Sequence, residues 1–86
     1  MPEISRFFGI VIKMFFDDHA PPHFHVEYDE YRAVFEIHAL VIINGYLPPR
    51  AHGMVIEWAS EHRDELLDLW QRAANRQPLY KLPPLK

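Results

Sequence analysis

The chain has 86 residues, of which 49% are apolar and 14% aromatic, enough for one small core and a single domain over 1–86. Nine basic and twelve acidic side chains give a net charge of −3, so the chain lacks the broad positive surface of a protein that binds nucleic acid by itself. Cysteine is absent, which excludes disulfides and thiolate metal sites and suits a reducing cytoplasm.

The first predicted element is a strand over 4–16, where Phe, Ile and Val alternate along the chain. Its apolar residues point to both faces, which indicates a central strand, and Gly9 marks a bulge or a close approach. The segment lacks a basic leader and is interrupted by Lys13, so we expect a strand and no signal peptide. No apolar run reaches the roughly 18 residues of a membrane span.

The next two strands are expected over 23–29 and 31–38, joined by a turn at 29–30. Two alternating sets of side chains keep to their own faces when paired residues have numbers that sum to 59. In this register Glu27 lies opposite Arg32, a favourable cross-strand pair. The pattern therefore predicts an antiparallel hairpin.

A further strand is expected over 40–44, ended by the Asn44-Gly45 turn signal. Pro48-Pro49 then opens a helix over about 50–75, in which apolar residues recur every three or four positions. An extended arm follows over 77–86. The predicted fold is α+β: a small antiparallel sheet of three to four strands, with one long C-terminal helix packed on one face.

Three of the six histidines lie within seven residues, in the segment Asp17-Asp18-His19-Ala20-Pro21-Pro22-His23-Phe24-His25. On a strand, His23 and His25 project from the same face, and the proline turn can bring His19 back toward them. Three imidazoles with a carboxylate or water form the ligand set of a zinc or other divalent transition-metal site. Glu36 and Asp18 are candidates to orient an imidazole or to activate a bound water.

Two other interpretations of these histidines stay open. Histidines on the solvent face of a strand need no function, and the proline turn also serves simply to join two strands. A group of histidines that titrates near pH 6–7 would instead form a pH-responsive binding surface.

Three residues are candidates to face a partner. Trp58 is a large aromatic residue on the predicted helix, while Tyr80 and Leu82 belong to the arm. Aromatic residues are enriched where proteins meet. We expect these side chains to mark an interface.

Several motifs resemble a bacterial family called domain of unknown function 4160. They are the segment 18–26, then Gly45-Tyr46-Leu47-Pro48, Glu57-Trp58, Glu65-Leu66 with Trp70, and Pro83-Pro84-Leu85. The resemblance spans Ser5 to Leu85. It implies a small cytoplasmic protein without an established activity, often encoded beside a second small protein as in toxin–antitoxin gene pairs.

We therefore expect a protein-interaction module, with the product of a neighbouring gene as its partner and self-association left open. The alternative is a metal-dependent hydrolase or nuclease that uses the His19/His23/His25 cluster. The low positive charge weakens the nuclease form of this alternative.

Overall fold

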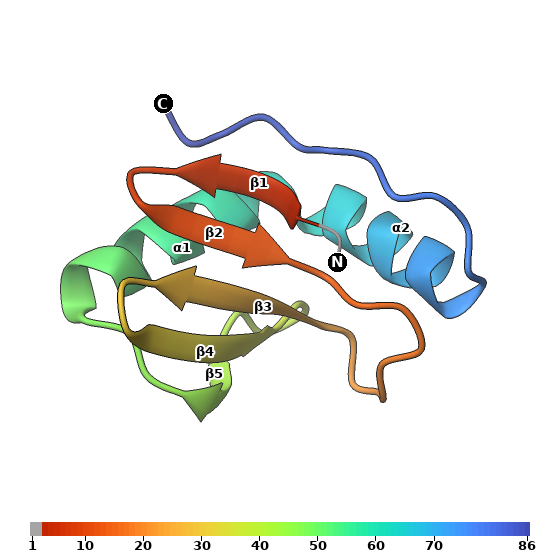
Figure 1. Cartoon of the computed structure of the whole chain (residues 1–86), viewed down its shortest axis with the longest axis horizontal. Coiled ribbons are helices and arrows are strands. Elements are labelled where there is room, and N and C mark those ends of the chain that lie inside the picture. Colours follow the sequence, from red (N-terminus) through yellow and green to blue (C-terminus); the bar gives the residue numbers. More distant parts are fainter. Residues whose placement is uncertain (1–2) are drawn as a thin grey trace.

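The computed structural model describes residues 3–86, which form a five-stranded antiparallel sheet in the order β1-β2-β3-β4-β5 with two helices against one face (Figure 1). The elements are β1 (Glu3–Phe7), β2 (Ile10–Lys13), β3 (His23–Tyr28), β4 (Tyr31–Glu36), β5 (Ile42–Gly45), α1 (Pro49–Glu61) and α2 (Arg63–Ala74). The α+β class is confirmed, but the sheet has more strands than expected and the helix is divided. In the described part of the chain, no helix is long and apolar enough to cross a membrane.

The predicted strand over 4–16 is wrong, because the chain reverses at Phe8 and Gly9 to form the β1–β2 hairpin. Both turn residues have a positive φ, 48° and 81°, as the type I′ hairpin turn requires. Phenylalanine rarely adopts this conformation, so the sequence contains only half of the usual turn signal. The reversal also explains the apolar residues on two faces, since they belong to two separate strands.

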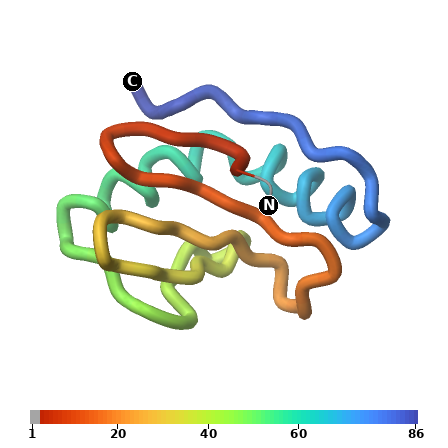
Figure 2. Tube along the Cα trace, viewed as in Figure 1, coloured from red at the N-terminus to blue at the C-terminus, as the bar shows by residue number. Residues whose placement is uncertain are grey.

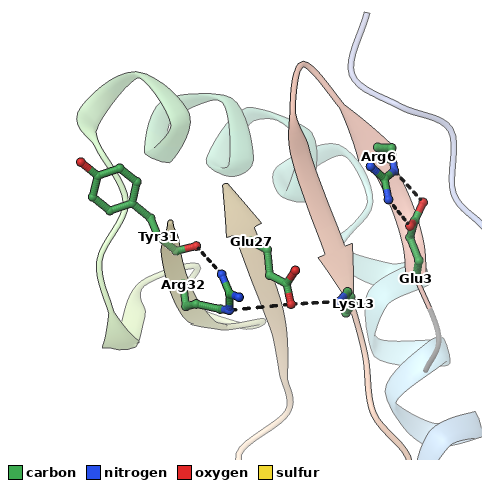
Figure 3. Close-up of polar contacts among 6 residues, drawn as sticks. All are labelled: Glu3, Arg6, Lys13, Glu27, Tyr31 and Arg32. Carbon is green, nitrogen blue, oxygen red and sulfur yellow. Dashed lines mark hydrogen bonds and ion pairs between the residues drawn. The ribbon is translucent and has the colours of Figure 1, made fainter. Parts of the chain in front are cut away.

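The β3–β4 hairpin has the predicted register, with His23 opposite Glu36 and Glu27 opposite Arg32. Figure 3 shows a charged row across the uncovered face of the sheet, where Lys13 Nζ lies 2.9 Å and Arg32 Nε 3.9 Å from Glu27 Oε2. Partly exposed ion pairs contribute little to stability, about 0–1 kcal/mol each. The register therefore follows mainly from the apolar residues on the opposite face.

The predicted single helix over 50–75 is interrupted at His62, whose φ of −121° and ψ of 21° leave the helical region. His62 ends α1 and precedes α2, and its Nδ1 lies 2.6 Å from Glu65 Oε1 in the first turn of α2. The apolar spacing of three and four continues through the break, from Trp58 to Leu66. Periodicity alone therefore could not reveal it.

The core lies between the sheet and the two helices, and Trp58 is at its centre. Its ring is fully buried and contacts Phe7 and Phe24, with ring centroids 5.5 and 6.2 Å away. The predicted interface role of Trp58 is therefore wrong, because the side chain faces the interior. The helices pack on the face of the sheet that carries Phe24, Val26 and Phe35.

The C-terminal arm runs beside β1, as Figure 2 shows for the blue end of the trace. Leu82 N donates to Ile4 O at 2.8 Å, Ser5 Oγ donates to Leu82 O at 3.2 Å, and Trp58 Nε1 donates to Pro83 O at 2.8 Å. Leu82 is 5% exposed, so its predicted role as a partner-facing residue is also wrong. The arm belongs to the core and covers the β1 edge of the sheet.

Candidate functional site

The loop between β2 and β3 brings Asp18 back to the first residues of β3. His23 and His25 are two residues apart on that strand and share a face. Asp18 Oδ2 lies 2.9 Å from His23 Nε2 and 3.0 Å from His25 Nε2. One carboxylate oxygen therefore meets two imidazole nitrogens, and these three atoms lie within 4.8 Å of one another.

The other nitrogen of His23 fixes the ring. Nδ1 lies 2.7 Å from the carbonyl oxygen of Pro21, and because a carbonyl only accepts, Nδ1 carries the hydrogen and donates it. The tautomer is thereby chosen by the backbone of the proline turn. Nε2 is then the nitrogen that faces Asp18 Oδ2.

Aromatic rings enclose the two histidines. The Trp70 ring of α2 lies 5.0 Å from the His23 ring, and the Phe15 ring lies 4.5 Å from the His25 ring, measured between centroids. The His23 side chain is 10% exposed, whereas His25 and Asp18 are 29% and 26% exposed. The cluster is thus held from the protein side and open to solvent on one side.

The charge of Asp18 follows from this setting. Burial by itself would raise the pKa of Asp18, but the hydrogen bonds of His25 and His23 and the charge of these rings lower the pKa below its ordinary value. Asp18 is therefore a carboxylate at neutral pH. The site presents one anionic oxygen beside two imidazoles.

Two predicted site residues take other places. His19 is exposed and lies outside the group formed by Asp18, His23 and His25. Glu36 lies opposite His23 in the sheet, but its carboxylate oxygens accept hydrogen bonds from the backbone amides of His38 and Ala39. Its carboxylate therefore closes the turn after β4 and is already engaged there.

We expect the contribution of Glu36 to stability to disappear in acid. Burial would raise the pKa of Glu36, but the amides of Ala39 and His38 outweigh this effect and lower the pKa, with further help from the charges of His38 and Arg63. Because the folded pKa lies below the unfolded one, the stabilisation is present above the unfolded value and is lost as the pH falls through the folded value.

Urea unfolding at several pH values tests this expectation. Glu36→Gln should cost about 1 kcal/mol at neutral pH and should lose stability less steeply than the wild type on acidification. Glu30→Gln, in the exposed β3–β4 turn, is the matched control and should follow the wild type. If the free energy of unfolding fell equally steeply with acidification in the wild type and in Glu36→Gln, the assignment would be contradicted.

The two edges of the sheet differ. The C-terminal arm covers the β1 edge. On the other side, β5 is the last strand of the described sheet. Val41, Ile43 and Tyr46 project around β5 and are 50%, 48% and 57% exposed. Tyr80, the third predicted partner-facing residue, is 37% exposed and donates to Asp68 from its hydroxyl group.

Three hollows of about 320–390 Å³ occur elsewhere on the surface. The first is lined by Phe8, Tyr28, Arg50 and Met54, at the end of the sheet where the β1–β2 turn lies. The other two involve the α1–α2 junction, one of them together with the end of the arm. None of these three hollows is lined by His23 or His25, so none supplies a substrate pocket beside the cluster.

Comparison with known proteins gave one match. The family model described as a domain of unknown function (DUF4160) matches residues 9–71, which include the histidine cluster, β5, all of α1 and most of α2. No curated protein and no solved structure matches the chain.

Proposed function

This chain belongs to the DUF4160 family, described as a domain of unknown function, and we propose that it is a protein-interaction module which takes up an extended segment of a partner at the edge of β5. The observation that carries the proposal is the contrast between the two edges of the sheet. The chain's own arm covers β1, whereas β5 has exposed apolar side chains beside its backbone.

Free edge strands usually carry protection against pairing with other chains, such as Lys, Pro or inward-pointing charges. The segment 41–46, Val-Ile-Ile-Asn-Gly-Tyr, contains no Lys, Pro or charged residue, although β5 is short and has a bulge in its pairing with β4. An added strand would form backbone hydrogen bonds with β5, and Val41, Ile43 and Tyr46 would lose contact with water. This combination supports β-strand addition as the mode of binding.

The partner in this proposal is the product of a neighbouring gene in a bacterial, toxin–antitoxin-like pair, bound in the cytoplasm. The absence of cysteine fits such a reducing compartment. Hydrolysis or nuclease activity at the histidines has less support, because Glu36 closes a turn and His19 lies outside the cluster.

Binding of the purified neighbouring gene product, measured by calorimetry, tests the proposal. Ile43→Asp should weaken binding about tenfold or more, since it places a charge in an apolar contact. A tenfold loss of affinity corresponds to about 1.4 kcal/mol. Phe8→Asp is the matched control, because Phe8 is 62% exposed at the β1–β2 turn, away from β5. This variant should leave binding unchanged.

Three results would contradict this assignment. They are equal effects of the two variants, no binding at micromolar concentration, and a dimer of this chain that Ile43→Asp dissociates while the neighbouring gene product stays unbound. The last result would make a second copy the occupant of the β5 edge.

A further inference from the structure

We propose that Asp18, His23 and His25 bind one divalent transition-metal ion of the Zn²⁺ type, through Asp18 Oδ2 and the two histidine Nε2 atoms. The inference is independent of the proposed interaction at β5, which lies beyond β4 in the sheet. It also differs from the set of three imidazoles that the spacing of the sequence suggests.

The two distances from Asp18 suit such an ion, and the two histidine Nε2 atoms lie within 4.8 Å of each other. Zinc binds imidazole nitrogen and carboxylate oxygen at about 2.0–2.2 Å, which places tetrahedral ligand atoms about 3.3–3.6 Å apart. The two distances from Asp18 Oδ2, 2.9 and 3.0 Å, therefore need to widen by only a few tenths of an ångström. The partly exposed side chain of Asp18 and the loop that carries it allow this small movement.

Two acceptors compete for the hydrogen of a neutral His23 ring. Two acceptors flank the ring, Pro21 O at Nδ1 and the Asp18 carboxylate at Nε2, and a neutral imidazole has a hydrogen for only one of them. A metal ion at Nε2 would also bind the Asp18 carboxylate. The Nδ1 hydrogen would then remain free to donate to Pro21 O. Histidines that bind a metal through one nitrogen usually donate a hydrogen bond from the other ring N–H, often to a backbone carbonyl.

The surroundings hold two ligands firmly and leave one side open. Trp70 and Phe15 pack on the rings of His23 and His25, which limits their rotation before an ion binds. The partial exposure of His25 and Asp18 leaves room for water as a fourth ligand. Three protein ligands with an open position give an exchangeable site and not a closed structural one.

Zinc and cobalt titrations of the full-length, tag-free protein test the proposal. Calorimetry should show one Zn²⁺ per chain with a dissociation constant in the micromolar range or below, and Co²⁺ should give the visible absorption of a tetrahedral site. Asp18→Asn and His25→Gln should each weaken Zn²⁺ binding by about 100-fold, since loss of even an outer partner costs 10–100-fold. Circular dichroism should show that both variants are folded, and neither replaces the buried His23.

His19→Gln is the matched control, because His19 is exposed and adjacent to Asp18 but lies outside the group. It should bind Zn²⁺ like the wild type. Saturating Zn²⁺ should raise the melting temperature of the wild type and of His19→Gln, but not of Asp18→Asn.

Several outcomes would overturn the proposal. If no stoichiometric binding occurs at micromolar Zn²⁺, the three side chains do not form a metal site. If His19→Gln abolishes binding while Asp18→Asn retains it, the ligand set is the one with three imidazoles. Ile43→Asp should keep full Zn²⁺ affinity, so failure of the metal site and failure of the β5 interface are distinguishable.

Discussion

Replacing Gly45 with alanine should destabilise the protein by about 3 kcal/mol or more, because the new methyl group has no space and the backbone is unsuited to it. A Cβ at this position would lie 2.1 Å from Arg32 O and 2.9 Å from Ala33 Cα. Both are backbone atoms of β4, so the overlap is relieved only by moving one strand from the other. The φ of +84° adds strain for any residue other than glycine.

Urea unfolding measures this loss, and hydrogen exchange of the β5 amides should show that the edge strand opens first. Gly53→Ala is the matched control, because Gly53 lies within α1 and a Cβ there meets nothing within 4 Å. It should stabilise the protein by about 0.5–1 kcal/mol. Effects of the same sign at the two glycines would contradict this account. Since Gly45→Ala displaces β5, it should also abolish binding at the proposed interface.

Trp58→Ala should cost about 3–5 kcal/mol, because it removes the largest fully buried side chain of the core. The cavity would lie between the sheet and α1, where the Trp58 ring meets Phe7, Phe24 and His62. A domain of this size has a total stability of about 4–13 kcal/mol. The variant is therefore expected to be partly unfolded at physiological temperature.

Trp58→Phe separates packing from the hydrogen bond of the indole. It keeps an aromatic ring but loses the donor to Pro83 O, so the arm over 77–86 should become more sensitive to limited proteolysis while the rest of the domain stays folded. Tyr46→Ala, which removes a ring that is 57% exposed, should change stability by no more than about 0.5 kcal/mol. Equal losses in Trp58→Ala and Tyr46→Ala would mean that the core is not centred on Trp58.

Local patterns in the sequence predict the central hairpin and the helical face. The β3–β4 register was predicted correctly because a shift by one residue would turn Phe24 and Phe35 away from the core. The apolar spacing of three and four in the helical segment likewise includes Val55, Leu66 and Leu69, which the structure buries.

Other features depend on residues that lie far apart or on single backbone angles. The turn at Phe8 contains a non-glycine residue with positive φ, which local propensity disfavours and the packing of β1 and β2 imposes. The interruption at His62 leaves the apolar spacing intact. Leu82 is buried because it contacts Ile4, near the other end of the chain. A local sequence pattern does not predict such a contact.

The candidate site likewise has one part that the sequence predicts and one part that only the tertiary structure decides. From the sequence alone, the alternation of the strand places His23 and His25 on one face, and the nearby histidines and carboxylates suggest metal-binding chemistry. Only the tertiary structure decides that Asp18, and not His19, joins them, because the path of the loop before β3 determines which side chain turns inward. Periodicity specifies the faces of regular elements, whereas the direction of an irregular loop is set by the contacts that its ends make with the folded core.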